Sequence, residues 1–149
     1  MRAWVVGGVC AGALLVPGTA MAAPAAVAFH GTAVLAEDRT EVLLTPRNGG
    51  SAEVADATVR LRWSVPLAER QELPARCVRE DERTVLCATG PLAADTAGER
   101  LRVPVRLRER PSELTLEVET AWSSDVPDQD RAGDRTQVLV LATGDEYAF

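Results

Sequence analysis

Residues 59–65 read Val-Arg-Leu-Arg-Trp-Ser-Val, so an apolar side chain falls at every second position. Residues 101–107, Leu-Arg-Val-Pro-Val-Arg-Leu, and residues 114–118, Leu-Thr-Leu-Glu-Val, repeat the pattern. Successive side chains of a strand point to opposite faces, so this period predicts three half-buried β-strands, each with one apolar face.

Weaker strand candidates lie on both sides of these three. They are residues 25–36, 41–45, 76–79, 84–88 and 136–142. Turn-forming pairs such as Asn48-Gly49 and Gly90-Pro91 separate them. No long helical period is present, although Leu67 to Leu73 has the spacing for one helical turn. We therefore predict an all-β, antiparallel β-sandwich of seven to eight strands.

Pro104 falls on the polar side of its strand. Proline has no backbone N–H to donate, so this position predicts an edge strand or a bulge.

Arginine occupies most polar positions of two strands, and glutamate occupies those of the third. Paired across strands, these side chains would form an exposed lattice of ion pairs, each worth about 0.2–1 kcal/mol. The alternative is an arginine patch that binds a ligand. The residues concerned are Arg60, Arg62, Arg102, Arg106, Arg108, Glu117 and Glu119.

The N-terminus is typical of a cleaved signal peptide. Arg2 precedes an apolar run from Val5 to Val16, and Ala20-Met21-Ala22 is a small-x-small cleavage site. The run is shorter than the ~20 residues that a membrane-spanning helix needs. We predict a signal peptide at residues 1–22, a domain at residues 23–149, and no transmembrane anchor. A buried first helix is the alternative.

The charge balance excludes some partners. The chain has 16 basic residues, all arginine, which is typical of a bacterium with a GC-rich genome. Without residues 1–22, 15 arginines face 22 acidic residues, a net charge of −7. Nucleic acid and anionic lipid would repel such a domain.

Cys77 and Cys87 remain after Cys10 leaves with the signal peptide. An even number of cysteines in an exported chain favours a disulfide. Opposite each other in a hairpin that turns near residues 81–83, the two side chains would be close enough to bridge. Free thiols are the alternative; a zinc site would lack half its ligands.

The order of these features resembles a known family. The cysteine hairpin, then Gly90-Pro91-Leu92-Ala93, the alternating strand at 100–107, and the loop Ser124-Asp125-Val126-Pro127-Asp128 are similar to the conserved-repeat Ig-like domains of bacterial surface proteins. The similarity covers residues 41–142. It implies an Ig-like sandwich with a structural, spacer or adhesive role and no catalytic residues. The turn at 95–98 is longer than the family's, and residues 131–134 lack its asparagines.

Two tryptophans and the C-terminal tail carry further expectations. Trp63 is expected to anchor the core between the sheets. Trp122 has the same parity as the apolar residues at 114–118 and is expected to point inward. Residues 144–149, Gly-Asp-Glu-Tyr-Ala-Phe, either dock through their aromatic side chains or extend free.

Catalytic and metal-binding residues are scarce. His30 is the single histidine, and no serine lies in a nucleophile-elbow context. We therefore expect no enzymatic activity and no required cofactor. The weak candidates for a calcium site are Asp125, Asp128, Asp130 and Asp134, which do not fit the EF-hand spacing. A solvated acidic loop is the alternative.

The sequence thus predicts a secreted, non-catalytic module, free in the medium or associated with the cell surface. Its role would be structural or adhesive, or it would bind an unidentified protein or cell-wall component. A calcium- or small-ligand-binding extracellular protein is the first alternative. A hydrolase, or a protease inhibitor that uses the loop from Glu69 to Pro74, is the second.

Overall fold

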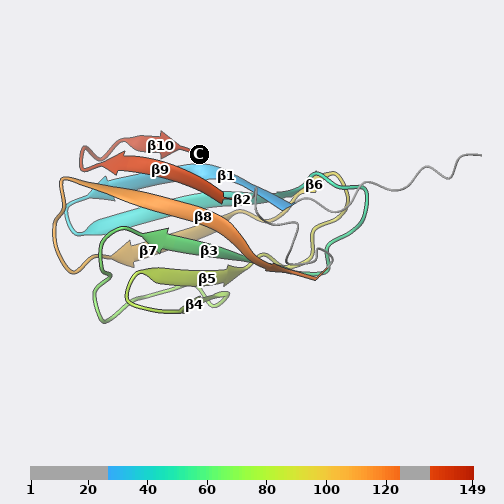
Figure 1. The fold of residues 1–149 in the computed structure, drawn as a ribbon, viewed down its shortest axis with the longest axis horizontal. Coiled ribbons are helices and arrows are strands. Elements are labelled where there is room, and N and C mark those ends of the chain that lie inside the picture. The colour runs from blue at the N-terminus through green and yellow to red at the C-terminus, as the bar shows by residue number, and fades with distance from the viewer. Residues whose placement is uncertain (1–26, 125–134) are drawn as a thin grey trace, which may run out of the picture.

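The computed structural model describes residues 27–124 and 135–149 (Figure 1). The predicted signal peptide at residues 1–22 lies outside them. The described residues contain ten strands and no helix. Accordingly, this part of the chain has no helix long and apolar enough to cross a membrane.

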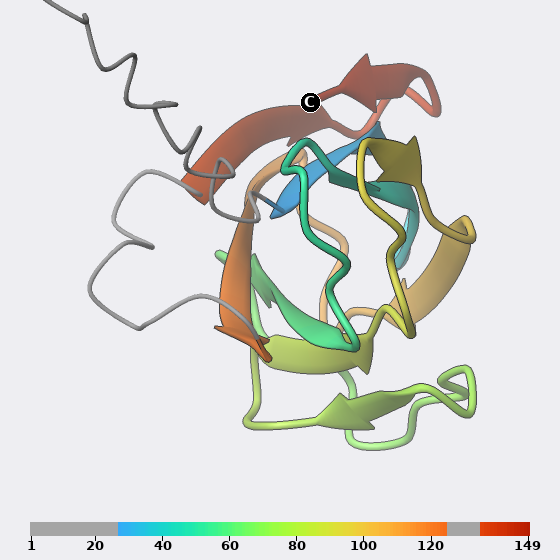
Figure 2. The same ribbon diagram turned by 90° about the vertical axis from the view of Figure 1, so that its right-hand side faces the viewer.

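Two five-stranded antiparallel sheets face each other, the arrangement of a β-sandwich (Figures 1 and 2). In the first, called the β2 sheet, β10 (Glu146–Ala148), β1 (Val27–Ala36) and β2 (Arg39–Asn48) lie in that order, and both β6 (Thr96–Ala97) and β7 (Leu101–Arg106) pair with β2. In the second, called the β3 sheet, the order is β4 (Cys77–Arg79), β5 (Thr84–Ala88), β3 (Ala57–Trp63), β8 (Glu113–Ser123) and β9 (Arg135–Leu141).

The alternating pattern of the sequence becomes the core. In β7 the residues at 101, 103 and 105 are buried, and those at 102, 104 and 106 are exposed. Trp63 is 1% exposed, and its indole Nε1 donates a hydrogen bond of 3.0 Å to Thr40 Oγ1 in the opposite sheet. Burial of such apolar faces from water is the main force that holds two sheets together. The all-β prediction is confirmed, and Trp63 lies in the core as expected.

All eight candidate strands are present. The structure adds β6 and β10, so the predicted total of seven to eight was too low. These two strands have two and three residues, too few to show a period in the sequence. Pro104 lies in β7, which pairs with β2 and forms an edge of its sheet, so the edge-strand prediction is confirmed.

The C-terminal tail docks. β10 pairs with β1, and Phe149 exchanges two backbone hydrogen bonds with Gly31, of 3.0 and 3.1 Å. A Cβ on Gly31 would lie 2.0 Å from the Leu43 carbonyl oxygen and 2.9 Å from the Phe149 ring. Glycine is therefore required where the tail pairs with β1. Figure 2 shows β9 and β10 side by side, where the edges of the two sheets meet.

Two sequence predictions were wrong. Leu67 to Leu73 form no helical turn; the backbone N–H groups of Leu67 and Ala68 instead donate to carbonyl oxygens of other segments. Trp122 is 47% exposed. The register between β3 and β8 shifts after Thr58, which faces Trp122, whereas Val59 already faces Thr120. This bulge inserts one residue and reverses the parity, so Ser123 points inward instead.

Candidate functional site

The segment at residues 66–72, here called the strap, lies in the chain between β3 and β4, which belong to the same sheet, and hydrogen-bonds to both sheets beside β7. Leu67 is fully buried, and its N–H donates to the Glu82 carbonyl at 2.7 Å. The next N–H, of Ala68, donates to the Arg106 carbonyl at 2.9 Å. The strap is thus held to the β4–β5 hairpin on one side and to the edge of β7 on the other.

Arg79 fastens the strap from the hairpin side. Its guanidinium donates to the carbonyl oxygens of Ala68 at 2.7 Å, Glu69 at 3.1 Å and Leu67 at 3.3 Å. It also bonds the carbonyls of its own hairpin turn, Asp81 at 2.9 Å and Glu82 at 3.4 Å. A planar guanidinium with five N–H donors suits this cluster of acceptors, which a single ammonium group cannot span.

Gln71 covers the edge of β7. Its side-chain Nε2 donates to the Arg106 carbonyl at 2.7 Å, and its Oε1 accepts from the Arg106 N–H at 2.9 Å. The amide therefore occupies the place of a neighbouring strand. Together with Pro104, which has no N–H, it blocks the part of this edge from Pro104 to Arg106, which would otherwise be open to pairing.

An open hollow of about 940 Å³ lies between the strap and the outer face of the β2 sheet. Its apolar lining residues are Val34, Ala36, Pro104 and Val105. Polar residues form the remainder, and four of them are arginines on β2, β7 and the strap: Arg39, Arg70, Arg102 and Arg106. Three glutamates accompany them: Glu41, Glu69 and Glu72. The hollow thus has a net charge of +1 on an acidic protein.

The arginines differ in their partners. Arg102 bonds Glu41 on the neighbouring strand, and this hydrogen bond raises the pKa of the guanidinium. Within the described residues, Arg39, Arg70 and Arg106 form no ion pair. Three cations of the described residues therefore face the hollow without a carboxylate in ion-pair contact.

The predicted ion-pair lattice is divided between two faces. On the β3 sheet, Glu119 accepts from Arg60 at 2.9 Å and from Arg135 at 2.8 Å. Burial raises the pKa of Glu119, but these two hydrogen bonds outweigh burial and hold it below the ordinary value. Arg102 and Arg106 do not join this network, because β7 belongs to the other sheet. The sequence pattern contained no information on which sheet each strand enters.

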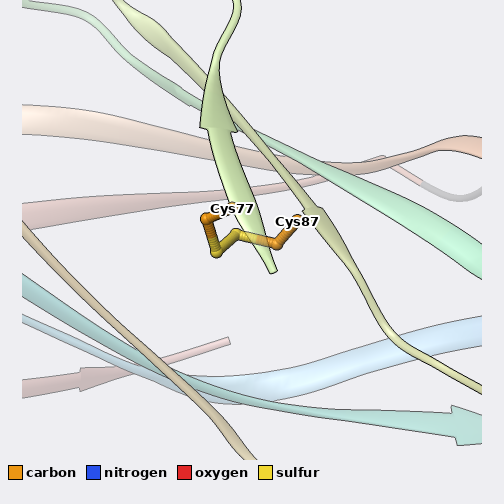
Figure 3. The surroundings of a disulfide bond; sticks show 2 residues. All are labelled: Cys77 and Cys87. Carbon is orange, nitrogen blue, oxygen red and sulfur yellow. A yellow bond between two sulfur atoms is a disulfide. The ribbon is translucent and has the colours of Figure 1, made fainter. Parts of the chain in front are cut away.

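Cys77 and Cys87 form a disulfide between β4 and β5 (Figure 3). The two residues are direct partners in the hairpin register, with Cα atoms 4.1 Å apart. The N–H of the neighbouring Ala88 donates to the Arg76 carbonyl at 2.9 Å, so the cysteines occupy a non-hydrogen-bonded pair. The disulfide prediction is confirmed, and the bond closes the hairpin that carries Arg79.

The remaining candidate residues carry little chemistry. His30 is exposed on β1, away from the hollow's lining. The calcium candidates Asp125, Asp128, Asp130 and Asp134 lie outside the described residues, and that site stays a prediction. Among the described residues, no group of three or more histidine, cysteine or acidic side chains is arranged to hold a metal ion.

No protein-family model matches the chain, and neither a curated protein nor a solved structure matches it. The resemblance to conserved-repeat Ig-like domains therefore rests on the sequence order alone.

Proposed function

We propose that this chain is an exported, non-catalytic, Ig-like module that binds a protein partner outside the bacterial cell or at its surface. The strand arrangement supports the Ig-like part. The third strand, β3, crosses into the second sheet and carries a buried tryptophan, as strand C does in immunoglobulin domains. The disulfide here lies elsewhere, within one sheet.

Two features support the extracellular part. Disulfides persist mainly in oxidising compartments, and Cys77 and Cys87 form one. The N-terminal sequence has the order of a secretory signal. On export, the N-terminus of the released chain is expected at Ala23. N-terminal sequencing of secreted material checks this, and a chain that retains Arg2 would contradict it.

The hollow beside the strap is the observation that carries the binding function. It combines apolar lining residues with three arginines that form no ion pair among the described residues, on a face built by β2, β7 and the strap. Concave sites with a few convergent polar groups are the usual places where ligands bind. Arginine is also enriched at protein interfaces.

Site-specific photocrosslinking in the source bacterium tests this function. A photoreactive residue at Ala36, which lines the hollow and is exposed, should give a discrete adduct with one envelope or secreted protein. The matched control replaces Arg62, which is exposed on the outer face of the β3 sheet. An adduct at position 36 and none at position 62 supports the proposal. No adduct at either position, or equal labelling at both, contradicts it.

A further inference from the structure

Two like charges lie directly opposite each other in the hollow. Arg39 on β2 and Arg106 on β7 are register partners, and both are exposed. The N–H and C=O of Arg106 both bond the strap, so the two arginines form a non-hydrogen-bonded pair, in which side chains approach most closely. Like charges at such a pair destabilise a sheet.

Among the described residues, neither Arg39 nor Arg106 forms an ion pair that would relieve this repulsion. Glu41, the nearest acidic position along β2, is engaged with Arg102. Arg70 faces the same hollow from the strap and adds a third unpaired cation. A local arrangement that costs stability without a compensating contact is expected where a protein binds a ligand. An anion between Arg39 and Arg106 would supply that contact.

The surrounding charges select the kind of anion. Glu69 and Glu72 also line the hollow, so a dense polyanion would meet them as well as the arginines. A ligand whose negative charges are spaced apart avoids that repulsion. A carboxylate also matches the two parallel N–H donors of a guanidinium.

The backbone groups at the edge of β7 favour a peptide over an acidic sugar as the ligand. Arg102, Pro104 and Arg106 lie at alternate positions of β7, so their backbone groups point in the same direction. Those of Arg106 point away from β2. The N–H and C=O of Arg102 therefore also point away from β2, at a position along β7 that the hydrogen bonds from Gln71 do not cover. One residue of an extended peptide could exchange both hydrogen bonds with Arg102, which is β-strand addition.

We propose that the hollow binds an extended acidic peptide of a protein partner. Its backbone pairs with Arg102, and one carboxylate lies between Arg39 and Arg106. This inference rests on the proposed function and adds the chemistry of the ligand. Side chains alternate in an extended strand, so carboxylates at every second position would all face the arginines.

Titration with a blocked hexapeptide of alternating threonine and glutamate tests the inference, with nuclear magnetic resonance detection on the oxidised chain. We expect shifts at the Arg102 amide and at the Nε of Arg39 and Arg106. The threonine–glutamine hexapeptide should bind at least tenfold more weakly. The threonine–glutamate hexapeptide should also bind the Arg39→Gln, Arg106→Gln double variant at least tenfold more weakly than the unchanged chain. The control variant Arg62→Gln should change the affinity less than twofold.

Three outcomes would overturn the inference. They are no binding at millimolar peptide, equal binding of the glutamine peptide, and equal or tighter binding of trigalacturonate, which offers carboxylates without a peptide backbone. Thermal unfolding gives a second readout: Arg39→Gln should leave the melting temperature unchanged or raise it, whereas a structural role would lower it. If an adduct forms at position 36 but the peptide does not bind, the proposed interaction function is supported and the acidic-peptide inference is refuted.

Discussion

Replacing Arg79 with glutamine should loosen the strap and leave the core folded. Three of the five hydrogen bonds from its guanidinium are 3.1 Å or shorter. Bonds from a charged donor are worth about 1.5–3 kcal/mol when shielded. Water competes at this half-buried position, so we assign under 1 kcal/mol to each short bond and nothing to the two long ones. The expected loss is about 2 kcal/mol of unfolding free energy.

That loss corresponds to a melting temperature lower by roughly 6–10 °C for a domain of this size. Urea unfolding measures the free energy, and hydrogen exchange locates the change. The Ala68 amide, which donates to the Arg106 carbonyl, should exchange much faster in Arg79→Gln. Core amides such as that of Val59 should exchange faster only to the extent that global stability falls. Arg79→Lys should recover less than half, because one ammonium group reaches few of these carbonyls.

The matched control is Arg76→Gln, which removes an arginine three residues away. Arg76 makes an ion pair of 2.8 Å with Glu99, and both side chains are largely exposed, so the loss should stay below about 0.5 kcal/mol. If Arg79→Gln costs no more than this control, or if exchange at Ala68 is unchanged, the strap does not depend on Arg79. The reasoning would then be refuted.

Replacing both Cys77 and Cys87 by serine should lower the unfolding free energy by about 2–3 kcal/mol, measured by urea unfolding; an unchanged midpoint would contradict the role of the loop closure. Trp63→Phe should cost about 2 kcal/mol, because it leaves the buried Thr40 hydroxyl without its donor, and adding Thr40→Val should restore part of the loss in calorimetry. The pKa of Glu119 is lowered in the fold, so its contribution is present above its unfolded pKa and is lost as the pH falls through the folded one. Unfolding measured between pH 7 and pH 3 should therefore show a flatter acid limb for Glu119→Gln, and parallel curves would exclude this effect.

Strand positions were predictable because burial of one face of a strand requires an apolar side chain at every second position, and this alternation is visible in the sequence. The residues at 101–107 alternate in the sequence and in the structure without exception. The hairpin disulfide was predictable for a related reason, since facing positions of a short hairpin follow from its two strands. The exposed position of Trp122 was not predictable, because no residue type indicates the bulge that reverses the alternation of the strand there.

The hollow could not be predicted, because it depends on register between distant segments. Arg39 and Arg106 are 67 positions apart, and nothing in either strand indicates that they face each other. The polar run at 69–72 between Pro66 and Pro74 was a usable signal, since it indicated a stiff exposed segment. Its position over β7 is set by the bonds from Gln71 and Arg79, which no local pattern reveals.

The same strap both protects an edge and forms one wall of the hollow, so stability and binding should be coupled at some residues and separate at others. Loss of Arg79 releases the strap, and the wall that carries Arg70 moves with it, so binding and unfolding free energy should fall together. Loss of Arg39 removes a repulsive partner of Arg106 and touches nothing that holds the strap, so binding should fall while stability does not. A chain that binds nothing here would gain stability from losing either Arg39 or Arg106, so a fall in binding without a fall in stability at Arg39 is the sign of a site kept for a ligand.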